Sequence, residues 1–140
     1  MYTDYASLRS ELSSGKVSCT DIVKYYLSNI EKGKHMNAFL LVFNEEALKQ
    51  AEVIDAKIKA GTAGKLAGMV IAVKDVLSLK GYKLTCGSKI LQNFEALYTA
   101  TAVQRLIDED VIIIGKTNCD EFAMGSSNEN SAYGNVLNPY

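Results

Sequence analysis

Residues 68–75 read Gly-Met-Val-Ile-Ala-Val-Lys-Asp, and this stretch decides the fold class. Its apolar run, Met69 to Val73, is short and uninterrupted, which is typical of a strand buried on both faces. Lys74 then emerges at the end of a core strand, where partial loss of hydration favours the neutral amine. A neutral lysine can accept a proton or form a Schiff base. The alternative is a solvated Lys74 that pairs with Asp75, which is the commoner role of a lysine at a strand end.

A second buried strand is expected at residues 111–114, Val-Ile-Ile-Ile, closed by Gly115. Between the two apolar runs, residues 101–109 carry apolar side chains at helical spacing. A strand, a helix and another strand form a βαβ unit, so the two strands are expected to be parallel.

The pattern before residue 68 predicts three helices and a short strand. The helices are expected to start at polar capping residues: Thr3-Asp4, the capping box Ser18-Cys-Thr-Asp21, and Asn44. The first helix should continue to Leu12, and the third should stop at Gly61. Residues 37–43 are strand-like. With neither repeats nor a low-complexity linker, residues 1–140 are expected to form a single unit.

Composition excludes several classes of protein. A net charge of −1 and a pI near 5.8 argue against a general nucleic-acid-binding surface, which would be basic. Three cysteines without a CxxC pair, and a single histidine, argue against a Cys/His zinc site. Free thiols without a signal peptide predict a cytoplasmic location. The apolar stretches are far shorter than the roughly 20 residues that span a bilayer.

Residues 114–117, Ile-Gly-Lys-Thr, invite comparison with the phosphate-binding loop GxxxxGK[ST]. The first glycine of that motif is replaced by Asp110, which would repel a phosphate, and residues 111–114 are strand-like. The comparison therefore fails where the phosphate-binding mechanism needs it.

A dense polar loop, residues 125–131, follows Phe122-Ala-Met124. Its hydroxyl and amide groups can orient a small polar substrate through hydrogen bonds, although an ordinary surface loop has the same composition. The adjacent carboxylates of Asp120 and Glu121 are more simply explained by interaction with a helix dipole.

Four segments resemble the amidase-signature family in sequence and in order: Gly68 to Asp75, Thr85-Cys-Gly-Ser88, Ile114 to Gly125, and Asn138-Pro-Tyr140. Within that family, residues 120–125, Asp-Glu-Phe-Ala-Met-Gly, followed by a loop rich in Ser, Asn and Glu, resemble the tRNA-dependent amidotransferases. The likeness covers essentially all 140 residues. The Lys-Asp pair alone is a weak signal, whereas the ordered set is specific.

The resemblance implies an α/β fold, the N-terminal part of an amidase domain, with a mixed sheet and helices on both faces. It also implies a Ser–cis-Ser–Lys triad in which Lys74 is the general base for a bridging serine. Met124, Gly125, Ser126 and Ser127 match the segment that binds substrate. No metal or organic cofactor is implied for the amidase step, and ATP and Mg²⁺ are expected only in a partner subunit.

The chain departs from the family in one respect. Both catalytic serines of the family follow the Asn-Pro element in a glycine- and serine-rich stretch, and the sequence stops at Tyr140. Ser126, Ser127 and Ser131 do not replace them, because their surroundings match the upstream loop. The 140 residues are therefore expected to be an N-terminal fragment without amidase activity of its own.

For the intact protein, the resemblance implies hydrolysis of glutamine to ammonia, which would amidate mischarged Glu-tRNA(Gln) or Asp-tRNA(Asn). The implied partners are the B and C subunits of such a complex, with tRNA bound through the complex and no membrane involved. One alternative is a stand-alone amidase that acts on small amides. Another is a non-catalytic interaction module in which Lys74 only pairs with Asp75.

Overall fold

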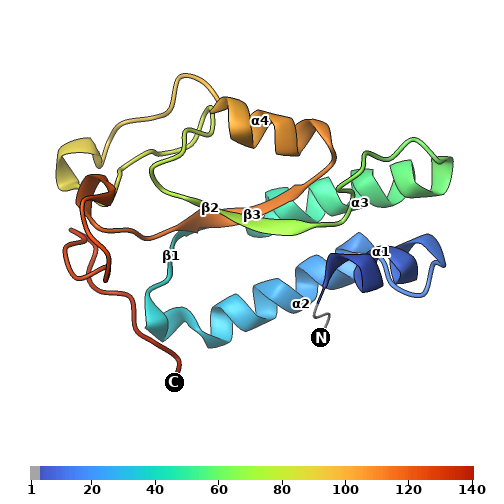
Figure 1. The fold of residues 1–140 in the computed structure, drawn as a ribbon, viewed down its shortest axis with the longest axis horizontal. Coiled ribbons are helices and arrows are strands. Elements are labelled where there is room, and N and C mark those ends of the chain that lie inside the picture. The colour runs from blue at the N-terminus through green and yellow to red at the C-terminus, as the bar shows by residue number, and fades with distance from the viewer. Residues whose placement is uncertain (1–3) are drawn as a thin grey trace. The chain divides into compact units, whose positions relative to one another are not determined.

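The structure, a computed structural model, describes residues 4–140 (Figure 1). The helices are α1 (Tyr5–Ser13), α2 (Cys19–Lys32), α3 (Asn44–Ala60) and α4 (Thr101–Asp108). The strands are β1 (Phe39–Val42), β2 (Val70–Lys74) and β3 (Ile112–Thr117). Three short 3₁₀ helices cover Lys34–Met36, Lys89–Leu91 and Glu121–Ala123.

The chain is organised as two compact units. Unit 1 contains the described residues up to Ile30, together with Phe43–Ile71 and Arg105–Ile114. Unit 2 contains Glu31–Val42, Ala72–Gln104 and Gly115–Tyr140. Strands β2 and β3 therefore begin in unit 1 and end in unit 2.

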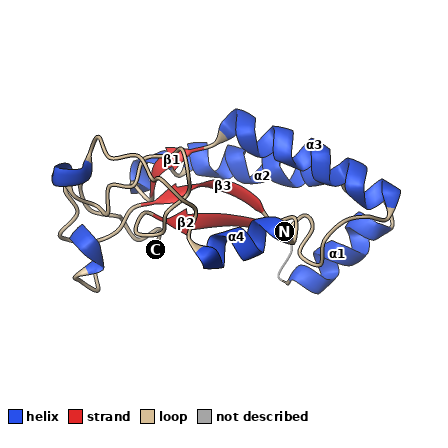
Figure 2. Cartoon of the chain, turned by 90° about the horizontal axis from the view of Figure 1, so that it is seen from above, coloured by secondary structure: helices blue, strands red, loops and turns tan. Residues whose placement is uncertain are grey.

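The strands form a mixed sheet in the order β1-β3-β2, with β3 in the middle (Figure 2). β1 is antiparallel to β3, and Val42 is opposite Gly115. β2 is parallel to β3, because Ile112 N donates to Met69 O near the start of both strands and Asp75 N donates to Thr117 O near their ends. The predicted βαβ unit is confirmed, with α4 in the connection.

In unit 1, the predicted caps of α1 and α2 form. Asp4 caps α1 by accepting a hydrogen bond from Ser7 N at 2.8 Å, while its neighbour Thr3 lies outside the described residues. The predicted capping box is confirmed at α2: Asp21 N donates to Ser18 Oγ, and Ser18 N donates to Asp21 Oδ2. These bonds satisfy backbone N–H groups that lack partners in the first turn.

The core of unit 1 is made by helices and the first half of β3. Its buried apolar side chains include Leu8, Leu12, Ile22, Val23, Ala51, Ile54, Val111, Ile112 and Ile113. In Figure 1, α1 and α2 lie together on one side of the unit 1 strand segments, and the end of α4 lies on the other. The α/β class with helices on both faces of a mixed sheet is confirmed.

Two local predictions are wrong. Asn44 is the first residue of α3 and not its cap; the preceding Phe43 makes no side-chain capping bond. Strand β3 does not close at Gly115 but continues to Thr117. A Cβ on Gly115 would collide with Leu41 O, so glycine is what lets β1 approach β3 at this point.

Strand β2 is also less buried than predicted. Val73 is its only buried residue, whereas Ala72 and Lys74 are exposed. The reason is strand order: β2 is at the edge of the three-stranded sheet, and an edge strand has a neighbour on one side only.

Among residues 4–140, no helix combines the length and apolar character needed to cross a bilayer.

Candidate active site

The candidate site is a pocket of about 370 Å³ in unit 2. Four segments provide its lining: Lys74 at the end of β2, Asn118 to Asp120 after β3, Gly125 to Asn128 in the polar loop, and Val136 to Asn138. The pocket therefore collects a lysine amine, serine hydroxyls, asparagine amides and one carboxylate in one place. Such a set can hold a small polar molecule and move a proton on it.

Lys74 enters this pocket from the end of β2, where the backbone is fixed on its C-terminal side. Lys74 O accepts a hydrogen bond from Leu77 N at 2.9 Å, and Asp75 N donates to Thr117 O at 3.1 Å. The side chain of Lys74 itself is exposed, so the predicted partial loss of hydration is wrong for the described residues. The edge position of β2 explains this difference.

The alternative pairing of Lys74 with Asp75 is also wrong. Within residues 4–140, the carboxylate of Asp75 pairs with the ammonium of Lys116, with 2.7 Å between Lys116 Nζ and Asp75 Oδ1. Both side chains are almost completely buried. Thr85 donates to the other carboxylate oxygen of Asp75 through both its backbone N and its hydroxyl. Lys74 is thus left free of its sequence neighbour.

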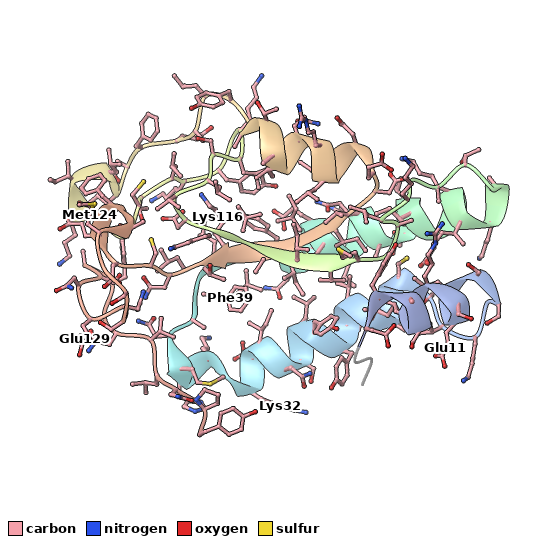
Figure 3. The ribbon with its side chains drawn as sticks, in the orientation of Figure 1. Glu11, Lys32, Phe39, Lys116, Met124 and Glu129 are labelled. Carbon is pink, nitrogen blue, oxygen red and sulfur yellow. The ribbon has the colours of Figure 1, made fainter. Side chains whose placement is uncertain are left out.

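The sequence alone did not predict this buried pair. Lys116 belongs to the segment that fails the phosphate-loop comparison, and it lies in strand β3 (Figure 3). One sequence feature could have predicted the pair: a charged residue, Asp75 or Lys116, follows shortly after each of the two apolar runs. If the two strands are parallel neighbours, the ends of both runs lie close together.

Asp120 organises the polar loop that forms one wall of the pocket. Its carboxylate accepts backbone N–H groups from Asn128 at 2.9 Å and from Asn130 at 3.0 Å. These hydrogen bonds hold the pKa of Asp120 below its usual value, and the positive charge of Lys74 acts in the same direction. Asp120 therefore remains a carboxylate and keeps the loop folded around it.

Asp120 and Glu121 stand at a helix start, as predicted: Asp120 is the N-cap and Glu121 the first residue of the three-residue 3₁₀ helix, while their interaction with a helix dipole stays a prediction. Glu121 also accepts a hydrogen bond from the Ser88 hydroxyl at 2.5 Å. Phe122 and Ala123 then adopt left-handed backbone angles, with φ of 52° and 58°. Non-glycine residues in this region are strained, and such strain is found in functional loops.

The structure brings together most of the predicted site residues. Lys74 lines the same pocket as Gly125, Ser126 and Ser127. Met124 is not among the lining residues; its side chain is 83% exposed (Figure 3). The hydroxyl of Ser127 donates to Glu129 Oε2 at 2.6 Å. The catalytic and substrate-binding roles of these residues stay predictions.

Comparison with known proteins identifies the family of this chain. The family model described as Amidase matches residues 21–140. The chain belongs to the amidase-signature family. The chain is 50% identical over 140 residues to the A subunit of the glutamyl-tRNA(Gln) amidotransferase of Pelodictyon phaeoclathratiforme, and the match covers 99% of this chain and 30% of that protein.

Solved structures agree with this family assignment. The peptide amidase of Stenotrophomonas maltophilia matches with a TM-score of 0.87 and 31% identity, over 99% of this chain and 30% of that one. The A subunit of the glutamyl-tRNA(Gln) amidotransferase of Thermotoga maritima matches with a TM-score of 0.68 and 32% identity, over 86% of this chain and 24% of that one. The chain spans less than a third of the length of these relatives.

Proposed function

We propose that the full-length gene product is the amidase subunit of a tRNA-dependent amidotransferase. In this proposal it hydrolyses glutamine, and the ammonia amidates Glu-tRNA(Gln) or Asp-tRNA(Asn) bound by the complex. The observation that carries the proposal is the pocket in which Lys74 meets the loop of Gly125 to Ser127. The 50% identity to the A subunit of an amidotransferase supports the choice of substrate.

The proposed chemistry assigns Lys74 the role of general base. In its neutral form it would take the proton of a bridging serine, which activates a nucleophilic serine to form an acyl-enzyme. Both serines would come from sequence beyond residues 1–140. The hydroxyls and amides of the loop would orient the glutamine side chain, which is a neutral amide and needs hydrogen bonds rather than charge. Residues 1–140 alone are proposed to be inactive.

The proposal extends to partners and location. B and C subunits would complete a cytoplasmic complex, and tRNA would bind through the complex, because the chain carries a net charge of −1. The amidase step would need no metal or organic cofactor. ATP and Mg²⁺ would serve a partner subunit.

The test is glutamine hydrolysis by the full-length gene product, purified with and without its partner subunits. Lys74→Ala is expected to lower kcat by about 10²–10⁴-fold, the usual contribution of a general base. Lys80→Ala, which removes an exposed lysine of unit 2, is the matched control and should leave kcat unchanged. Equal activity of the Lys74→Ala variant and the control would remove Lys74 from the reaction.

A stand-alone amidase is the second candidate. It is favoured by the match to a peptide amidase, which has a TM-score of 0.87. Release of ammonia from small amides or peptide amides, at a rate that the partner subunits do not change, would select this function. Glutamine hydrolysis that rises when the partner subunits are added would select the amidotransferase.

A further inference from the structure

The ion pair between Asp75 and Lys116 is the most completely buried charged contact of unit 2 within the described residues. Lys116 is 0% exposed and Asp75 is 1% exposed. Apart from the pair itself, Lys116 Nζ donates to Lys83 O at 2.9 Å. No described buried side-chain N or O atom lacks a hydrogen-bond partner, so neither charge of the pair is left without one.

Stability alone does not account for such a pair. Removing two charges from water is unfavourable, and apolar residues of similar volume often fill the same space at equal or better stability. We therefore expect the ion pair to have a function that apolar residues at these two positions could not perform. Its place in the fold suggests one, because Asp75 follows Lys74 directly and Lys116 lies on the neighbouring strand β3.

Asp75 fixes the backbone on the C-terminal side of Lys74 through five contacts. Its main chain donates to Thr117 O and accepts from Cys86 N, both at 3.1 Å. Its carboxylate binds Lys116 at one oxygen and accepts from both the backbone N and the hydroxyl of Thr85 at the other. Because these five contacts hold Asp75 in place, the backbone of the preceding residue, Lys74, has little freedom to move.

The side chains of Lys74 and Asp75 enter different pockets of unit 2. Lys74 lines the pocket with Asp120, whereas Asp75 lines a second one with Lys83 and Thr85. The ion pair can therefore act on Lys74 through the backbone that joins the two residues.

We propose that Asp75 and Lys116 are positioning residues for Lys74: their ion pair fixes the end of β2 and so holds the Lys74 amine in its place in the pocket. This inference rests on the proposed role of Lys74 as general base. It adds to the residues of the reaction Asp75, which directly follows β2, and Lys116, which lies in β3.

The test compares Lys116→Met with the double variant Asp75→Asn/Lys116→Met in the full-length gene product with its partner subunits. Lys116→Met removes the partner that ties the Asp75 carboxylate to β3, so kcat should fall by about 10²-fold with little change in KM. The double variant also lacks the ion pair, so its kcat should stay reduced while its KM stays near the wild-type value.

A purely structural role predicts a different result. It would lower the melting temperature of both variants and leave the kcat of the folded enzyme unchanged. Wild-type kcat in the folded double variant, or in folded Lys116→Met, would overturn the inference. If Lys116→Met does not fold, the double variant and Thr85→Val decide by their kcat, because neither contains an unpaired charge at this site.

Lys74→Ala is measured in parallel, so that two failures can be told apart. Unchanged activity of Lys74→Ala would overturn the proposed function itself. Loss of activity in Lys74→Ala, together with wild-type kcat in Lys116→Met and in the double variant, would overturn only the positioning role.

Discussion

Gly125 lies directly against the carboxylate of Asp120: a Cβ added to Gly125 would be 2.5 Å from Asp120 Oδ2. The same carboxylate holds the backbone N–H groups of Asn128 and Asn130. A glycine is therefore required for the loop to close around Asp120, because any other side chain would have to displace either the carboxylate or the loop.

Gly125→Ala is expected to move the loop away from its position beside Lys74. Because Ser126 and Ser127 are predicted to bind substrate, the main effect should be a KM for glutamine raised by about tenfold or more, with a smaller change in kcat. Steady-state ammonia release by the full-length gene product measures both constants. An unchanged KM would mean that the loop tolerates the methyl group or does not contact the substrate.

Gly64→Ala is the matched control for this prediction. A Cβ on Gly64 would be 2.6 Å from the backbone of Glu109, which is a comparable clash, but Gly64 belongs to unit 1 and does not line the pocket. Overpacking of this kind typically lowers stability by about 1–3 kcal/mol. The variant should therefore melt at a lower temperature while KM of the folded enzyme stays at the wild-type value.

The lowered pKa of Asp120 predicts how the stability of the protein depends on pH. Hydrogen bonds from Asn130 and Asn128 lower its pKa in the folded protein. A lowered pKa means that the carboxylate stabilises the fold above its unfolded pKa of about 4, and that this contribution is lost as pH falls through the folded value. Asp120→Asn should therefore lower the melting temperature at pH 7 and flatten its decline in acid.

Melting temperatures from about pH 6 down to about pH 2.5 would check this expectation. Glu52→Gln, which removes an exposed carboxylate on α3, is the control and should follow the wild-type curve. If Asp120→Asn followed the same curve as this control, the carboxylate would not be what holds the loop.

Local sequence signals predicted most of the fold because they depend on neighbouring residues. The capping box of Ser18 and Asp21 and the apolar runs of β2 and β3 are of this kind. The exposure of β2 could not be predicted in the same way. It depends on strand order, which places β2 at the edge of the sheet.

The candidate site was predictable only in part, for a related reason. Lys74 was predicted from its place after an apolar run and the loop of Gly125 to Ser127 from its polar composition, motif resemblance supported both, and the structure places them in one pocket. The pair of Asp75 and Lys116 depends on the register of two strands far apart in the sequence, and no local pattern specifies that register.

The three cysteines are expected to differ strongly in reactivity. Burial raises the pKa of Cys19 to about 12, with a further contribution from the hydrogen bond and negative charge of Asp55. Burial raises the pKa of both Cys119 and Cys86, but Cys119 is buried whereas Cys86 is only half-buried and open to reagents. Because the thiolate is the nucleophile, Cys86 should react first with iodoacetamide at pH 8, and Cys19 only after unfolding. Mass spectrometry of a labelling time course would establish the order.

Asp55 joins two helices of unit 1 and provides the last prediction. From α3, its carboxylate accepts Cys19 N at 2.7 Å, Thr20 N at 3.2 Å and the Thr20 hydroxyl at 2.9 Å. The first-turn N–H groups of α2 therefore depend on a side chain from α3 as well as on their own capping box.

Asp55→Ala should lower the free energy of unfolding by about 1–2 kcal/mol, the usual effect of losing a helix cap. It should also speed alkylation of Cys19, since the negative charge and the hydrogen bond that raise the pKa of this thiol are both removed. Urea unfolding and the labelling rate of Cys19 report the two effects separately. Ser28→Ala, at an exposed position of α2, should change neither. Reduced stability without faster labelling would leave burial as the dominant cause of the unreactive thiol and limit Asp55 to its capping role.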